Sequence, residues 1–187
     1  MKIALFFAVF SIVLVSCDSP GGSSTTPGLP VSTAGNPGGG SQTSPVTLDS
    51  EEAAFVVLIN AYRVQNGLTP LQVSVTLTES SKWLNQDMIA NNYFDHTDSL
   101  GRDPGTRMFF FGYPSNASDW GENIAAGNAT AQDTFTQWKN SPPHNANMLG
   151  SGYAAIGVGR AYGAASTYGW YWTTDFGSVV DSVMVTL

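Results

Sequence analysis

The stretch WKNSPPHNANML, residues 138–149, carries one of only two histidines in the chain and lies where two helices are expected to meet. Apolar residues recur at helical spacing over 130–139, which predicts a helix there. Because proline lacks an amide hydrogen and restricts the residue before it, Pro142-Pro143 is expected to end that helix. A second helix is then predicted from His144 to Leu149, with its last two residues in the core.

The other histidine and a single glutamate lie in similarly polar surroundings. His96 stands in YFDHT, residues 93–97, and Glu122 stands in GENIA, residues 121–125. Imidazole is the side chain best suited to metal ligation and to proton transfer near neutral pH. If the fold brings His96, Glu122 and His144 together, they form the candidate chemical centre of this protein.

Two more helices are predicted upstream. Asp49 and Glu52 have the spacing of a capping box, and apolar residues then recur at helical spacing until Asn66-Gly67 ends the helix. Thr76 and Glu79 repeat the capping pattern ahead of another helix. The apolar face of that helix is expected to hold Trp83, Leu84 and Met88.

The second half of the chain favours strands. Residues 154–162 and 168–176 are rich in Val, Ile, Tyr, Trp and Thr, and 179–185 is a third candidate strand. In the second strand Trp170, Trp172, Thr174 and Phe176 alternate, as in a strand with one face in the core, while Tyr171, Thr173 and Asp175 lie on the opposite face.

Between residues 93 and 128 we expect loops, with Phe109, Phe110 and Phe111 as a buried plug. Helices first and strands last indicate an α+β domain with an antiparallel sheet.

The composition excludes some functions and limits the sources of stability. Fourteen acidic residues outnumber seven basic ones, for a net charge of −7, so the attraction to phosphate that drives nucleic-acid binding is missing. With one cysteine, no intrachain disulfide can form. Stability must therefore come from core packing, to which five tryptophans and ten phenylalanines contribute.

The first residues have the pattern of an export signal. Lys2 supplies a positive charge, and residues 3–15 form an apolar run shorter than the ~20 residues of a membrane-spanning helix. The run ends at LVSC, residues 14–17, which resembles a bacterial lipobox, and this resemblance implies cleavage and acylation at Cys17. A plain secretory signal with a chance cysteine is the alternative.

We therefore expect a signal peptide at residues 1–16, a lipidated Cys17 with a flexible tether at 17–47, and a folded domain at 48–187. The tether is rich in Gly, Ser, Thr and Pro and too poor in apolar groups to offset its ordering entropy. Its span is roughly 30 Å. The expected location is the extracytoplasmic side of a bacterial cell membrane or outer membrane, with the membrane as a partner through Cys17.

Five motifs occur in order along the domain. They are FDHT (94–97), GENIA (121–125), WKNSPPHNANML (138–149), IGVG (156–159) and YWTTDFG (171–177). Together they resemble the CAP superfamily, also called SCP-like, which comprises cysteine-rich secretory proteins, antigen 5 and pathogenesis-related 1. The similarity is to the disulfide-free bacterial branch and covers about residues 50–177.

This resemblance implies an α-β-α sandwich with a central antiparallel sheet and a large cleft that holds two histidines and two acidic residues. His96, Glu122 and His144 match three of those four positions, and Ser141 stands at the fourth. Ser141 and Asn123 are expected to support the cleft.

Several functions stay open at this point. His96, Glu122 and His144 with a water resemble the composition of catalytic zinc sites, so a weak divalent-cation site, for zinc or another ion, is one expectation. A hydrolase would use Glu122 as general base, with His144 as the other catalytic candidate. Ser141 and His144 are disfavoured as a nucleophile pair, because no third residue orients the imidazole.

A polar network that only organises the cleft is an alternative to the metal site. We expect a non-catalytic binding module for a small apolar molecule, a peptide or a cell-wall fragment, with a metal-dependent hydrolase as the alternative.

Overall fold

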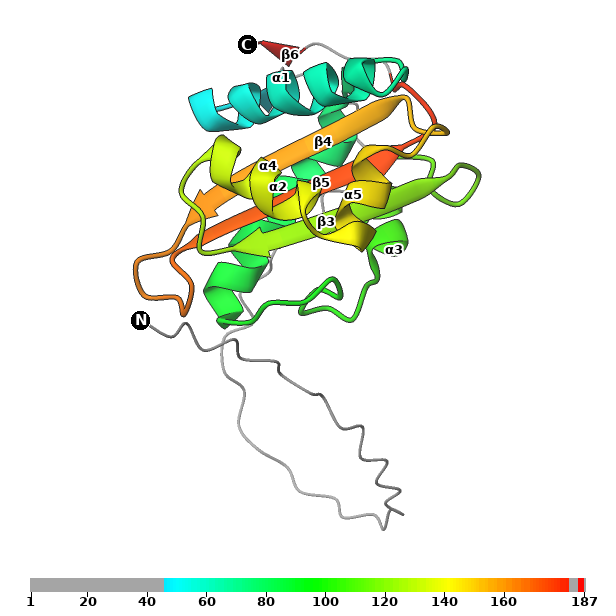
Figure 1. Ribbon diagram of the computed structural model, residues 1–187. Helices are drawn as coiled ribbons and strands as arrows, with labels where there is room; N and C mark the ends of the chain where they lie inside the picture. The colour runs from blue at the N-terminus through cyan, green and yellow to red at the C-terminus, as the bar shows by residue number, and fades with distance from the viewer. Residues whose placement is uncertain (1–45, 182–184, 187) are drawn as a thin grey trace, which may run out of the picture. The chain divides into compact units, whose positions relative to one another are not determined.

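A computed structural model describes residues 46–181 and 185–186, with side chains up to residue 181 (Figure 1). The expected signal and nearly all of the expected tether lie outside the described residues. The elements follow in the order β1 (Val46–Thr47), α1 (Ser50–Gln65), β2 (Gln72–Val73), α2 (Val75–Asn91), α3 (Pro104–Phe110), β3 (Trp120–Ala126), α4 (Ala131–Lys139), α5 (Pro142–Met148), β4 (Ala155–Tyr162), β5 (Trp170–Gly177) and β6 (Val185–Thr186). Among the described residues, no helix has the length and apolarity needed to cross a membrane.

The main sheet has the strand order β2-β4-β5-β3, and β1 pairs with β6 in a separate parallel pair. β3, β4 and β5 are antiparallel as expected, whereas the two-residue β2 runs parallel to β4. The sheet is therefore mixed rather than wholly antiparallel. A two-residue strand leaves no periodic pattern from which it could be predicted.

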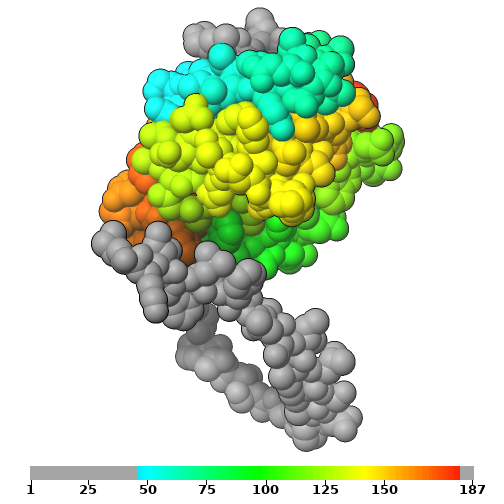
Figure 2. All heavy atoms as spheres, in the orientation of Figure 1, coloured from blue at the N-terminus to red at the C-terminus, as the bar shows by residue number. Residues whose placement is uncertain are grey.

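Helices cover both faces of this sheet, which confirms the α+β sandwich. In Figure 1, α4 and α5 lie in front of the sheet and α2 lies behind it. Figure 2 shows α1, α4 and α5 over the near face. The core between this layer and the sheet contains Phe55, Ile59, Phe135, Trp138, Met148, Ile156, Val158, Trp172 and Phe176. On the far face, Leu84 and Met88 of α2 pack against Ile124 and Tyr171.

Burial of both faces explains how β5 differs from its predicted pattern. Trp172, Thr174 and Phe176 are buried as expected, but Tyr171 and Asp175 on the other face are equally buried. A strand in the middle of a sandwich has no solvent face, so its alternation does not separate polar from apolar residues.

Two glycines of β4 let α2 approach the sheet closely. A Cβ on Gly157 would lie 2.1 Å from the backbone carbon of Leu77, and one on Gly159 would lie 2.7 Å from the backbone nitrogen of Lys82. The IGVG motif therefore serves helix packing.

Most helix boundaries agree with the sequence analysis. The capping box is confirmed: Asp49 Oδ1 accepts from the amides of Glu51 and Glu52, each at 2.8 Å, and Glu52 Oε2 accepts from the Asp49 amide at 2.8 Å. The cap predicted at Thr76 is wrong. Ser74 caps α2 by accepting from the Leu77 amide at 3.1 Å.

The region between residues 93 and 128 is more ordered than predicted, since it contains α3 and β3. Phe109 and Phe110 are 54% and 44% exposed, so the buried plug is wrong there, and the large apolar side chain of α3 that is buried is Met108. Asp103 caps α3 through the Thr106 amide and sets which residues face inward.

No strand covers residues 179–181, contrary to the candidate strand at 179–185. Residues 182–184 lie outside the described residues, and β6 begins only at Val185.

Candidate functional site

The two histidines line one cavity of about 430 Å³ at the sheet edge formed by β3. His96 lies in the loop after α2, on one side of the sheet, and His144 lies on α5, on the other side. The cavity is lined by Phe94, Asp95, His96, Ile124, Ala126, Gln137, His144 and Tyr168.

Asp87, near the C-terminal end of α2, fixes the loop that carries His96. Its carboxylate accepts from the Tyr93 hydroxyl at 2.5 Å and from the Ser99 amide at 2.8 Å. Because these two donors flank the loop, the polypeptide between them is held at both ends. His96 is thereby placed at the edge of β3.

Glu122 lies behind the His96 ring. Its Oε1 is 2.7 Å from His96 Nδ1, and its Oε2 pairs with the guanidinium of Arg107. A second nitrogen of Arg107 donates to the His96 carbonyl at 3.0 Å. The side chain of Glu122 is only 1% exposed, whereas that of His96 is 48% exposed. Glu122 thus orients the imidazole from the interior.

A fourth group, Asp175, completes this network. It lies directly opposite Glu122 in the pairing of β3 with β5 and is fully buried. Neither of its oxygens, taken as a carboxylate, accepts a well-formed hydrogen bond among the described residues, although the nearby Ser80 hydroxyl acts to lower its pKa. The roles of Asp175 and Arg107 were not predicted from the sequence. For Asp175 a signal was present, namely a carboxyl group inside an apolar strand, because unpaired acids are rarely buried.

The pKa values of the two acids follow from this burial. Burial and the neighbouring Glu122 raise the pKa of Asp175 well above its usual value. Burial raises the pKa of Glu122 to about 7, although Arg107 and the hydrogen bond with Asp175 act to lower it. We infer that Asp175 stays protonated and donates to Glu122, so that the pair carries one charge opposite Arg107.

Both imidazoles favour the neutral form. Burial lowers the pKa of His96, and Arg107 adds to this effect while Asp95 opposes it. Burial also lowers the pKa of His144, helped by the nearby His96. Neutral rings can accept a hydrogen bond or ligate a metal near neutral pH.

His144 is held from its own side of the sheet. Its Nδ1 lies 2.8 Å from the Ser141 hydroxyl, which occupies the N-cap position of α5 without capping it. The side-chain amide of Asn123 donates to the His144 carbonyl at 3.0 Å and accepts from the side-chain amide of Asn147 at 2.9 Å. Ser141 and Asn123 therefore contact His144 directly.

The imidazole rings of His96 and His144 make the same kind of contact with the protein. Each Nδ1 contacts a protein oxygen, and neither Nε2 has a hydrogen-bond partner among the described residues. A ligand in the cavity can therefore meet two imidazole nitrogens that the protein itself does not use.

The same geometry bears on metal binding. Within residues 46–181, no three His, Cys, Asp or Glu side chains are grouped to hold an ion. Two imidazoles are available, but both oxygens of Glu122 are engaged by His96 and Arg107. The three-ligand site therefore stays a prediction, and it requires Glu122 to release one of these partners.

Asp175→Asn should flatten the pH dependence of stability. The folded-state pKa of both acids is raised, so their contribution to stability is present below about pH 4 and is lost as the pH rises, which for Glu122 happens through about pH 7. An asparagine can still donate to Glu122 but cannot ionise. In urea titrations between about pH 5 and 8, we expect the free energy of unfolding of Asp175→Asn to fall by roughly 1–2 kcal/mol less than that of the wild type. The exposed Asp119→Asn should keep the original slope, and an unchanged slope in Asp175→Asn would refute the coupling.

Known proteins resemble this chain over most of the domain. An uncharacterized protein of Bacillus subtilis, YkwD, is 36% identical over 133 residues, which cover 71% of this chain and 49% of that protein. The chain thus spans about half the length of this curated relative.

Two solved structures share the fold. An outer surface protein of Borrelia burgdorferi has a TM-score of 0.60 at 21% identity, and the match covers 70% of this chain and 95% of that one. An extracellular protein of Bacillus anthracis that contains an SCP domain has a TM-score of 0.57 at 26% identity, with 66% of this chain and 39% of that one covered. Residues 56–176 match the family described as CAP, so the chain belongs to the cysteine-rich secretory protein family.

Proposed function

We propose that this protein is an exported, membrane-anchored binding module whose cleft between His96 and His144 holds a peptide or a cell-wall fragment. The supporting observation is the pair of imidazoles whose Nδ1 atoms contact the protein and whose Nε2 atoms have no partner among the described residues. Such fixed polar groups can orient a ligand without changing it.

The rest of the cavity suits a ligand with both apolar and polar parts. Phe94 and Tyr168 form an edge-to-face pair with ring centroids 5.8 Å apart, and both rings are partly exposed. Ile124 adds apolar surface, while Asp95 and Gln137 add polar groups. Aromatic walls with a few placed polar groups are typical of small-ligand sites. A wholly apolar ligand would leave both imidazoles unpaired and is therefore less suitable.

The proposed location rests on the N-terminal residues and on the relatives. The lipobox-like LVSC at 14–17 implies acylation of Cys17, and several acyl chains hold a protein at a membrane firmly. The descriptions of the Borrelia burgdorferi and Bacillus anthracis proteins, as outer surface and extracellular, support export.

Nitrogen-15 spectra of the histidine rings, recorded during titration with soluble peptidoglycan fragments and with tripeptides, test this function. We expect one probe class to shift both rings, with the same affinity in the presence of a chelator. His144→Ala should weaken binding at least ~10-fold, as expected for loss of a central polar contact. Val57→Ala, exposed on α1, should not. Binding that a chelator abolishes, or no probe that reaches both rings, would contradict the proposal.

A metal-assisted hydrolase is the second candidate, and the His96–Glu122 contact favours it. A carboxylate that holds one imidazole nitrogen and frees the other recurs behind metal ligands and in hydrolases. Added zinc should then produce turnover of a peptide or ester substrate, and His96→Ala or Glu122→Ala should abolish it. Zinc binding without turnover would leave only a structural or ligand-binding metal.

A further inference from the structure

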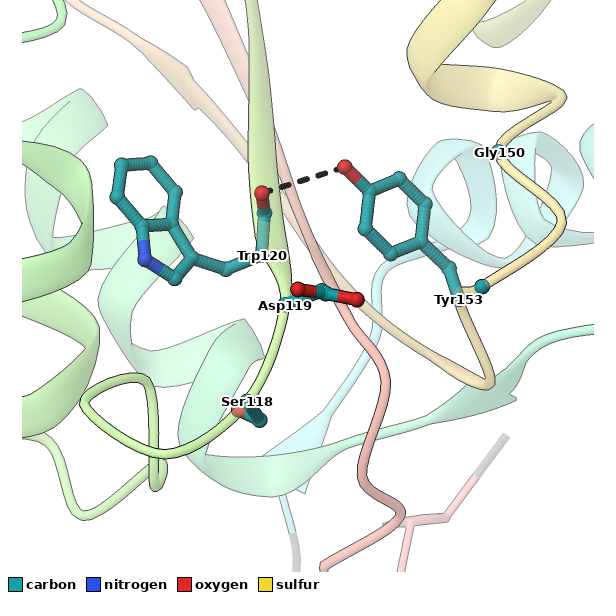
Figure 3. Close-up of a pocket in the computed structure, with 6 residues that line it drawn as sticks. Ser118, Asp119, Trp120, Gly150 and Tyr153 are labelled. Carbon is teal, nitrogen blue, oxygen red and sulfur yellow. Dashed lines mark hydrogen bonds between the residues drawn. The ribbon is translucent and has the colours of Figure 1, made fainter.

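A second cavity lies at the other end of β3. It has a volume of about 440 Å³ and is lined by Ser118, Asp119, Trp120, Gly150, Gly152 and Tyr153 (Figure 3). Trp120 begins β3, whereas Ile124 and Ala126, which line the histidine cleft, lie in its second half. The two cavities share no lining residue.

Two aromatic rings form the walls. Figure 3 shows Trp120 and Tyr153 on opposite sides, with the Asp119 carboxylate between them. The Trp120 indole lies against Gly105, where a Cβ would come within 2.6 Å of the ring. Tyr153 stacks on Phe176 at 5.5 Å, and its hydroxyl donates to the Trp120 carbonyl at 3.2 Å. Both rings are therefore fixed by packing.

Glycines keep the cavity open. A Cβ on Gly150 would lie 2.6 Å from the Tyr153 ring, so no side chain fits there. At Gly152 the nearest atom to such a Cβ is Asp119 Oδ2, at 3.8 Å. A side chain at Gly152 would thus enter the space beside the carboxylate.

The Asp119 carboxylate has no hydrogen-bond or ion-pair partner among the described residues. Its backbone is nevertheless fixed, because its amide donates to the Ser178 hydroxyl at 3.1 Å and its carbonyl accepts from the Ser178 amide at 3.0 Å. Burial raises the pKa of Tyr153, and the nearby Asp119 charge adds to this effect. A negative charge on a fixed stretch of backbone therefore lies near the Tyr153 ring.

The other polar groups of this cavity can mainly accept hydrogen bonds. The Ser118 hydroxyl donates to the Pro114 carbonyl at 2.8 Å, and the Tyr153 hydroxyl donates to the Trp120 carbonyl at 3.2 Å. The Trp120 indole nitrogen would lie 2.8 Å from a Cβ on Gly105, so this edge of the ring lies against α3. A sugar needs both donors and acceptors, whereas an ammonium group only donates and is attracted to aromatic faces.

We propose that the cavity between Trp120 and Tyr153 binds an organic cation of the class of a lysine side chain or a free amino group. Asp119 supplies the counter-charge, and the two rings supply cation–π contacts. This site is separate from the histidine cleft, so the loss of one function leaves the other intact.

The test is a titration of the full chain with n-butylammonium chloride, followed by the indole resonance of Trp120, with 1-butanol and methyl glucoside as uncharged probes. Only the amine should saturate the site. Asp119→Asn should weaken its binding at least ~5-fold, in line with loss of a charge partner beside aromatic rings. Gly152→Leu should abolish it by filling the cavity. Asp95→Asn, in the histidine cleft, should leave the affinity unchanged.

Three results would overturn the proposal. Equal shifts with butanol would make the cavity a nonspecific apolar pocket, and tighter binding of methyl glucoside would make it a sugar site. Amine binding that survives both Asp119→Asn and Gly152→Leu would place the cation elsewhere.

Discussion

Replacing Arg107 with methionine should lower the free energy of unfolding by about 3–5 kcal/mol near pH 8, which is typical of removing one partner from a buried ion pair. Arg107 is fully buried and pairs with Glu122, and it also holds the His96 carbonyl. Without it, the charge shared by Glu122 and Asp175 has no counter-charge in the interior.

The loss in Arg107→Met should shrink at lower pH. Both acids have raised pKa values already, and removal of the guanidinium raises that of Glu122 further, so near pH 5 both can be protonated. Urea denaturation at the two pH values measures the difference. The exposed Lys139→Met should change stability by less than about 1 kcal/mol at either pH. A loss that is independent of pH would show that packing, not charge, explains the effect.

Gly157→Ala is expected to prevent folding, or to destabilise the domain by more than about 4 kcal/mol. The added Cβ would lie 2.1 Å from the Leu77 backbone, and the backbone of a helix cannot move aside as a flexible side chain can. α2 would have to leave the sheet, and with it the loop that carries His96.

Gly152→Ala is the matched control for this substitution. The nearest atom to its Cβ is 3.8 Å away, so thermal unfolding should occur within a few degrees of the wild type. If Gly157→Ala unfolds at the same temperature as Gly152→Ala, the close approach of α2 to β4 is wrong.

Local patterns in the sequence were enough to predict the parts of the fold that local interactions stabilise. The capping box at Asp49 and Glu52 and the helix at 131–139 follow from spacing alone. The strands at 155–162 and 170–177 follow from their β-branched and aromatic residues.

β3 was not predicted, because Gly, Glu and Asn disfavour strands when judged by propensity. Its seven residues pair along their whole length with β5, and this pairing overrides the local preference. Within this strand Glu122 contacts His96, and Asn123 donates to the His144 carbonyl. The residues of the GENIA motif therefore gave no indication that they form β3.

The partners of the histidines depended on tertiary contacts. Arg107 precedes Glu122 by fifteen residues and comes from α3, a helix that the sequence analysis did not anticipate. Asp175 reaches Glu122 only through strand pairing. Neither contact leaves a periodic signal in the sequence. The family resemblance therefore predicted the two histidines and the glutamate, but not the residues that position them.

The tautomer of His96 tests the central geometry most directly. Near pH 8, long-range nitrogen–proton correlation spectra should show the ring proton on Nδ1, where the Glu122 carboxylate accepts it at 2.7 Å, with Nε2 unprotonated at the cavity. Glu122→Gln should change the chemical shift of that Nδ1 proton. A proton found on Nε2, unaffected by Glu122→Gln, would mean that Glu122 does not orient the ring and that the cleft is not built as described.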